Sequence, residues 1–129
     1  FYYLSRGLPQ DSKAFDSDTT IYINYTGRLL NGRVFDTTIK DTAIMYGIYS
    51  SKNKYTPKEV KYYKDDYNQI TLAGNKVIDG FSYTIHKMKP YEKASGIFIS
   101  EYGYSSSGTG NTIPPYAALR FDIEIVDKP

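Results

Sequence analysis

The stretch Leu119–Val126 constrains the fold more than any other part of this 129-residue chain. Apolar residues alternate along it with charged or polar ones, so that Arg120, Asp122 and Glu124 share one face and the apolar side chains share the other. This period of two is typical of a strand with one buried and one solvated face. The glycine-rich segment 108–115 precedes it and ends in two consecutive prolines, which fix the backbone. We therefore expect a loop pinned against a core strand, which suits the rim of a pocket.

Length, charge and composition exclude several classes of protein. The length suits one domain, which we predict over residues 1–129. A formal charge of +2 without a basic cluster argues against nucleic acid as a partner. No apolar run approaches the roughly 18 residues of a membrane span. The chain has no cysteine and one histidine, His86, which excludes disulfides and cysteine or multi-histidine metal sites. The carboxylate pairs Asp16 with Asp18 and Asp65 with Asp66 are interpreted as solvated rather than as a loose calcium site, so we expect no metal and no cofactor.

The compartment is not determined by the sequence. The chain starts at Phe1 without an initiator methionine, which indicates a processed or trimmed product, so any signal peptide would lie outside it. Fifteen tyrosines, with no tryptophan and no cysteine, favour an exported protein, periplasmic or on the cell surface, over a cytoplasmic one.

Alternation elsewhere predicts further strands. Residues 20–27 alternate cleanly, and Asn31-Gly32 shortly after them is the strongest short signal for a β-hairpin. The return strand of this hairpin is expected at 34–36. Other short strands are expected at residues 1–4, 70–72 and 93–100.

One helix is needed to cover such a sheet. Phe81, Ile85 and Met88 are spaced to form one apolar stripe, and Pro90 ends the pattern. A helix this short is not stable alone, so the stripe must pack on the sheet. We predict an α+β domain in which a twisted, mostly antiparallel sheet of five or six strands wraps around one short helix.

Residues 38–69 show no sustained period and are interpreted as an insertion or a functional loop. Within them, Thr56 and Glu59 are spaced as a capping box, with Pro57 at the first helical position. These signals predict a second short helix near 57–64.

No constellation for covalent catalysis is evident. A serine–histidine–acid triad would have to use His86, near the end of the predicted helix, which we interpret as a surface or partly packed residue. The glycine-rich loop leads into a strand, whereas a phosphate-binding loop opens a helix.

Three separated segments form one pattern. The first is Tyr25-Thr26-Gly27 with Asn31-Gly32 and Val34-Phe35-Asp36-Thr37; the second is Val77-Ile78-Asp79-Gly80-Phe81 with Met88-Lys89. The third is Tyr102-Gly103-Tyr104, Gly108 and the segment from Ile113 to Asp122. In this order they resemble the FKBP-type peptidyl-prolyl isomerases and cover most of the chain outside 38–69. The family fold, an antiparallel sheet curled around a short helix, agrees with the elements predicted above.

The activity that this resemblance implies is rotation about X–Pro peptide bonds. Rotation is slow without a catalyst, behind a barrier of roughly 18–20 kcal/mol. No bond breaks, so no nucleophile or general base is needed. A pocket that fits the twisted amide better than either planar isomer is sufficient.

The resemblance also implies a site. Phe81 would form the floor, the Tyr104 hydroxyl and the Ile78 backbone N–H would hold substrate carbonyls, and Asp36 would provide a polar contact beside the twisting amide. The implied catalytic residues are Tyr25, Phe35, Asp36, Tyr104 and Phe121, and the implied substrate-binding residues are Val77, Ile78, Phe81 and Ile113.

The chain departs from the family pattern in three places. Phe81 replaces the usual tryptophan, and Asn68 stands where an aromatic residue is expected, so one wall is missing or comes from Tyr67. The extra length between Phe35 and Val77 would lie near the site. It would cap the pocket, extend substrate contacts or dock a partner, or be a tolerated surface loop.

Two functions are consistent with these residues. The first is an isomerase, expected as a monomer, that acts on proline-containing unfolded or flexible polypeptides and has macrolides as candidate ligands. The alternative is a binding or chaperone-like module of the same fold with weak or no isomerase activity.

Overall fold

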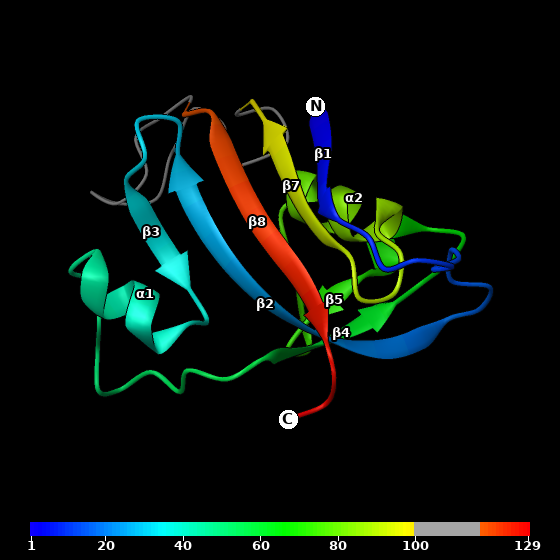
Figure 1. Ribbon diagram of the computed structural model, residues 1–129, viewed down its shortest axis with the longest axis horizontal. Coiled ribbons are helices and arrows are strands. Elements are labelled where there is room, and N and C mark those ends of the chain that lie inside the picture. The colour runs from blue at the N-terminus through cyan, green and yellow to red at the C-terminus, as the bar shows by residue number, and fades with distance from the viewer. Residues whose placement is uncertain (100–116) are drawn as a thin grey trace.

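The computed structural model describes residues 1–99 and 117–129. Within them, an antiparallel sheet of eight strands curls around the helix α2 (Figure 1). The expected α+β class is therefore confirmed, with two more short strands than predicted, β4 and β6. The elements in chain order are β1 (Tyr2–Gly7), β2 (Thr19–Leu29), β3 (Val34–Thr37), α1 (Lys40–Met45), β4 (Lys58–Tyr62), the 3-10 helix η1 (Tyr67–Gln69), β5 (Thr71–Leu72), β6 (Asn75–Lys76), α2 (Asp79–Lys87), β7 (Lys93–Phe98) and β8 (Leu119–Val126).

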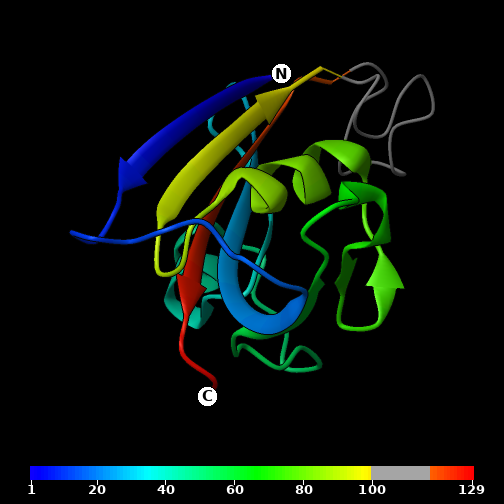
Figure 2. The same cartoon turned by 90° about the vertical axis from the view of Figure 1, so that its right-hand side faces the viewer.

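The central strands are β8 and β2. The strand order is β1-β7-β8-β2-β4-β5-β6, and β3 also pairs with β2. Along β2, residues Tyr22–Leu29 pair with β8, and residues Thr19–Ile23 pair with β4. Figure 2 shows β2 strongly curved, with α2 lying on the inside of the curve. One long bent strand thus joins the two halves of the sheet around the helix.

The predicted hairpin between β2 and β3 is confirmed. The N–H of Gly32 donates to the Leu29 carbonyl oxygen at 3.0 Å, and Gly32 has a φ of 91°. Glycine suits this position because it has no Cβ to oppose a positive φ. The hairpin brings β3 back beside β2, which places Asp36 opposite Gly27.

The hydrophobic core lies between α2 and the sheet. The predicted stripe is confirmed, since Phe81, Ile85 and Met88 are at most 2% exposed. Gly80 packs directly on the ring of Phe98, where a Cβ would collide with the ring carbons. Gly80 therefore allows α2 to approach β7 closely. None of the helices in the described ranges has the length and apolar composition needed to cross a membrane.

The predicted helix near 57–64 is wrong, because this segment forms β4. Val60 and Tyr62 are buried and Lys61 between them is exposed, which is the alternation of a strand. The strand pairs with β2 on one side and β5 on the other. These pairings satisfy the backbone on both sides and bury two large side chains, which outweighs a local capping signal.

The segment before β4 contains the helix α1, which was not predicted. Residues 38–57, called the α1 arm below, run from the end of β3 to the start of β4. Ala43 is the buried residue of α1, whereas Ile44 and Met45 are exposed. Because so little of α1 is apolar and buried, no apolar stripe marked it in the sequence. That residues 38–69 are an insertion stays a prediction.

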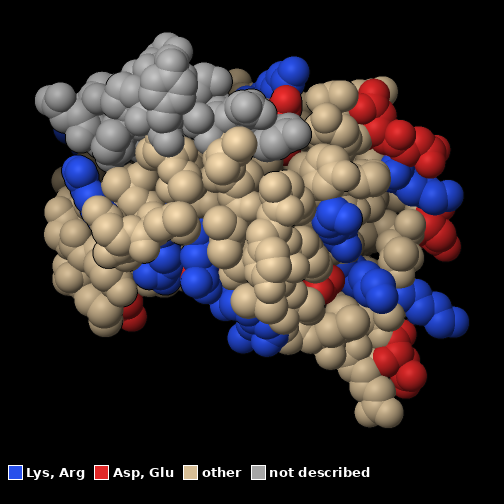
Figure 3. Space-filling model, turned by 90° about the horizontal axis from the view of Figure 1, so that it is seen from above, with Lys and Arg blue, Asp and Glu red and all other residues tan. Residues whose placement is uncertain are grey.

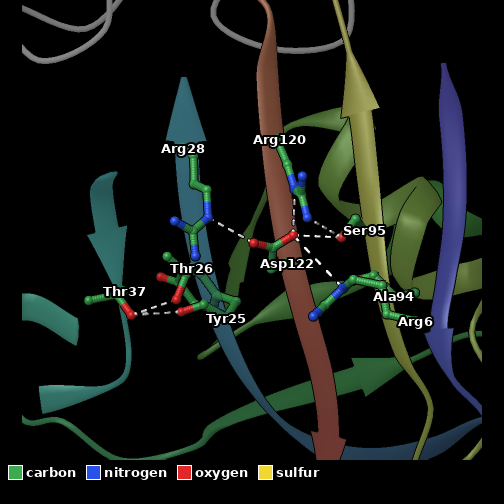
Figure 4. A network of polar contacts seen from close by, with 9 residues as sticks. All are labelled: Arg6, Tyr25, Thr26, Arg28, Thr37, Ala94, Ser95, Arg120 and Asp122. Atoms are coloured by element: carbon green, nitrogen blue, oxygen red, sulfur yellow. Dashed lines mark hydrogen bonds and ion pairs between the residues drawn. The ribbon is translucent and has the colours of Figure 1, made fainter. Parts of the chain in front are cut away.

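Charged side chains are distributed over the surface in small groups. On the face seen in Figure 3, Lys and Arg lie in several separate places among uncharged side chains. The densest network of ion pairs among the described residues lies instead on the outer face of the sheet, around Asp122 (Figure 4).

Asp122 joins four strands through its carboxylate. Arg28 Nε donates to Oδ2 at 2.8 Å, and Arg120 Nε donates to Oδ1 at 2.8 Å. The Ser95 hydroxyl also donates to Oδ1, and Arg6 Nε lies 4.0 Å from the same oxygen. Burial alone would raise the pKa of Asp122, but the hydrogen bonds from Ser95, Arg120 and Arg28 outweigh it and hold this pKa below its usual value.

This network predicts an acid-sensitive contribution to stability. A carboxyl whose pKa is lowered by folding stabilises the protein above its unfolded pKa, about 3.9, and loses that contribution as the pH falls through the folded pKa. We expect Asp122→Asn to lower the free energy of unfolding by about 1–3 kcal/mol at pH 7. Below about pH 4, the difference in the free energy of unfolding between the variant and the wild type should become smaller. Urea denaturation at a series of pH values measures both effects.

Glu124→Gln is the matched control on the same face of β8. Glu124 is partly exposed and pairs with Lys93 at 3.6 Å near the surface, so its loss should cost at most about 1 kcal/mol. Equal effects of the two substitutions would contradict the assignment of the network to Asp122.

Candidate functional site

A pocket of about 250 Å³ opens between the start of α2 and the strands β2, β3 and β8. Six of the nine residues implied by the family resemblance line it. Two further lining residues, Leu72 and Lys76, come from β5 and β6. The complete described lining is Tyr25, Asp36, Leu72, Lys76, Val77, Ile78, Phe81 and Phe121.

The three remaining implied residues lie elsewhere. Phe35 stands behind the lining, with its ring centroid 5.6 Å from that of Phe121 in an edge-to-face arrangement. Tyr104 and Ile113 fall outside the described residues. The roles of all nine residues stay predictions, but the structure brings seven of them together.

The pocket wall is built from edge-to-face aromatic pairs. The ring of Phe81, which is 2% exposed, lies 5.2 Å from Tyr25 and 5.0 Å from Phe121, both nearly perpendicular. Such pairs stabilise by about 0.5–1.5 kcal/mol beyond the area that they bury. Phe81 is therefore held rigidly in the pocket wall.

Gly27 allows two of these rings to pack on the backbone of β2. A Cβ at this position would lie 2.7 Å from Phe35 Cζ and 2.8 Å from Phe121 Cε1. Both separations are well below van der Waals contact, so any side chain would push the rings away. The lack of a side chain at Gly27 thus fixes one side of the pocket.

Two polar groups stand at the edge of this apolar wall. The Tyr25 hydroxyl donates to Asp36 Oδ2 at 2.9 Å, which fixes the position of an otherwise exposed carboxylate. The Ile78 carbonyl accepts hydrogen bonds from Phe81 and Ser82 in the first turn of α2. Among the described residues, the Ile78 backbone N–H takes part in no hydrogen bond, so it is available to a ligand.

The family pattern places an aromatic pocket residue at the position of Asn68. Asn68 does not line the pocket, whereas Leu72 does. Asn68 is exposed in η1, where its N–H donates to Asp66 Oδ1 at 2.9 Å. Tyr67 does not replace it, because its ring packs 5.0 Å from Tyr83 and 6.4 Å from His86. Leu72 could have been found from its place in the predicted strand 70–72, whereas exposed Lys76 gave no signal.

His86 lies outside the pocket. Its Nε2 is 2.7 Å from the Lys64 carbonyl oxygen, and its ring stacks on Tyr62 with centroids 6.1 Å apart. The interpretation of His86 as a partly packed residue is confirmed. Across residues 1–99 and 117–129, no cluster of three or more His, Asp or Glu side chains could hold a metal ion.

A larger cavity, of about 430 Å³, lies near α2 and β1 and is lined by Phe1, Tyr3, Gly80, Tyr83 and Lys87. None of the nine implied residues lines it. Part of its wall is the first residue of the chain, so its shape depends on where the chain begins. The smaller pocket is the better candidate, because an aromatic wall, a fixed carboxylate and an N–H with no partner in residues 1–99 and 117–129 converge there.

The contact at Gly27 yields a test of the pocket wall. We expect Gly27→Ala to displace the Phe35 and Phe121 rings and to lower the free energy of unfolding by about 1–3 kcal/mol. Gly7→Ala is the matched control, since a Cβ at Gly7 would meet Lys93 at an ordinary 3.9 Å. Denaturant midpoints of both variants measure the difference, and equal midpoints would rule out the packing argument.

Known proteins resemble this chain in sequence and in fold. Residues 11–126 match the family model described as FKBP-type peptidyl-prolyl cis-trans isomerase. A probable FKBP-type peptidyl-prolyl cis-trans isomerase of Haemophilus influenzae is 30% identical over 86% of this chain, which spans only 36% of that relative. An FK506-binding protein of Neisseria meningitidis serogroup B is 32% identical over 82% of the chain and 76% of the relative.

A solved structure agrees with these relatives. The crystal structure of FkpA from Escherichia coli superposes with a TM-score of 0.60 and 25% identity, covering 97% of this chain and 46% of that one. All eight residues that line the pocket lie within the matched range, residues 11–126. The chain belongs to the family of FKBP-type peptidyl-prolyl cis-trans isomerases.

Proposed function

We propose that this chain is a peptidyl-prolyl cis-trans isomerase that accelerates rotation about X–Pro bonds in unfolded or flexible polypeptides. The observation that carries the proposal is the pocket itself. A rigid aromatic wall shares the pocket with the carboxylate of Asp36 and with the N–H of Ile78, which has no partner among the described residues. This combination suits a proline ring and the polypeptide backbone around it.

The chemistry requires only that the pocket bind the twisted amide better than the planar one. Twisting removes amide resonance and its charge separation, so an apolar, water-poor wall favours the twisted state. Each tenfold gain in rate needs about 1.4 kcal/mol of such differential stabilisation. Phe81 and Phe121 would supply the apolar surface next to the proline ring.

The polar groups hold the substrate while the bond rotates. The Ile78 N–H would donate to a substrate carbonyl outside the rotating amide and so anchor one side of the chain. Asp36, fixed by Tyr25, would contact the amide at its other edge. Positioned groups of this kind need no reorganisation during the reaction, which is the main source of their effect. The predicted roles of Tyr104 and Ile113 complete the proposal.

The alternative, a module of this fold without efficient catalysis, has less support. It was motivated by the Asn68 position and by the long insertion; Asn68 does not line the pocket, whereas Leu72 does. We therefore favour catalysis over binding alone.

Proline-containing polypeptides are the proposed substrates. A macrolide of the FK506 class is a proposed competitor, because the Neisseria relative is named an FK506-binding protein. We also propose that the chain acts as a monomer. Export stays a prediction from composition.

The hydrogen bond between Tyr25 and Asp36 gives the central test. We expect the wild type to accelerate isomerisation of an X–Pro peptide, and Tyr25→Phe to lower kcat/KM about tenfold, because a hydrogen bond to a carboxylate stabilises by about 1.5–3 kcal/mol. A protease-coupled or NMR exchange assay measures these rates.

Tyr91→Phe is the control for that experiment. Tyr91 donates to Asp127 Oδ1 at 2.6 Å, so this variant loses the same type of bond on an exposed site away from the pocket. Its rate should equal that of the wild type. Wild-type protein no faster than the uncatalysed reaction would overturn the proposal, and equal losses in the two variants would remove Tyr25 from the mechanism.

A further inference from the structure

A second, smaller pocket shares a wall with the proposed isomerase pocket. It has a volume of about 160 Å³, and both pockets are lined by Tyr25 and Asp36. The hydrogen-bonded pair of these two residues is thus a partition between them. The other lining residues of this side pocket come from the end of β3, the α1 arm and the start of β4, and are Thr37, Thr38, Asn53, Lys54, Tyr55 and Lys58.

The lining of the side pocket is polar and partly fixed. The ring of Tyr55 stacks on that of Tyr49 with centroids 5.5 Å apart. The Tyr55 hydroxyl oxygen accepts from the backbone N–H of Ser50 at 3.1 Å and from Asn53 Nδ2 at 3.5 Å. Among the described residues, this hydroxyl donates to no acceptor, so the phenolic proton is available to a ligand.

Two lysines, Lys54 and Lys58, line the same pocket as this donor. Lys58 Nζ donates to the Lys54 carbonyl oxygen at 3.1 Å, which holds the two residues together. Within the described part of the chain, neither lysine has a carboxylate at ion-pair distance. The lining contains one acid, Asp36, which already accepts from Tyr25. The pocket therefore has an excess of positive charge and of donors.

We propose that the side pocket is a substrate subsite that binds a carboxylate side chain, Asp or Glu, close to the proline. This inference rests on the proposed isomerase function, since it assigns a sequence preference to the same substrate. An extended chain advances about 3.3–3.6 Å per residue, so a side chain within about three residues of the proline reaches across the shared wall. The α1 arm, in this view, extends the contacts of the substrate.

Peptides that differ at one position test the preference. A neutral peptide with a single proline would carry Glu, Gln or Lys at each position from three before to three after the proline. At one or two positions we expect kcat/KM to be about twofold to fivefold higher for the Glu peptide than for the Gln peptide, which is the effect of one exposed ion pair. At the same positions, kcat/KM for the Lys peptide should be lower than for the Gln peptide. The preference should fade in about 1 M salt, where charges are screened within about 3 Å.

Variants assign the preference to the side pocket. In the double variant Lys54→Gln/Lys58→Gln, the ratio of kcat/KM for the Glu peptide to that for the Gln peptide should fall to about one, because the positive charges that attract the carboxylate are removed. Lys13→Gln is the control, because Lys13 is exposed, lines none of the pockets above and removes the same charge. Its ratio and its activity should match those of the wild type. A preference that survives in the double lysine variant would overturn the inference.

A failure of this inference differs from a failure of the proposed function. Wild-type protein that isomerises Glu and Gln peptides equally at every position overturns the subsite alone. If no peptide is isomerised, the isomerase proposal fails, and the subsite is decided by binding. NMR titration with the Glu and Gln peptides must then show tighter binding of Glu, with shifts at Lys54, Tyr55 and Lys58. Equal binding overturns the subsite in that case too.

Discussion

The close packing of Phe35 and Phe121 on the backbone of Gly27 is the contact on which the rest of the structure depends. Phe121 also stacks on Phe98 at 5.8 Å and meets Phe81 at 5.0 Å, so the same ring belongs to the pocket wall and to the core. Core side chains pack at crystal-like density and move little. The pocket is therefore rigid because its wall is the core, and a rigid wall can distinguish a twisted amide from a planar one.

The strand that carries Phe121 is fixed from both sides. Phe121 faces the helix, while its neighbour Asp122 faces outward into the arginine network (Figure 4). A slip of β8 by one residue would bury Asp122 and expose Phe121. Two opposed requirements on adjacent residues thus set the register of β8 against β2 and β7, and with it the depth of the aromatic wall.

Burial patterns explain which parts of the structure were predictable. The alternation of β8 and the stripe Phe81, Ile85 and Met88 follow from one buried face, so they could be read directly from the sequence. The strand β4 was missed because Thr56 and Glu59 gave a local helical signal, whereas pairing with β2 depends on residues far away in the chain.

The missed pocket residues have a related cause. Leu72 and Lys76 are brought to the site by the turn between β5 and β6, where Ala73 has a φ of 50°. Residues other than glycine rarely adopt that conformation, so the alanine gave no indication of the turn that brings Lys76 to the site. The α1 arm is similar, since its contact with Tyr25 and Asp36 depends on a few polar side chains and little apolar burial. A segment held in this way can change its sequence without disturbing the core. The proposed selection of substrates on one side of the Tyr25–Asp36 pair is therefore separable from the proposed catalysis on the other.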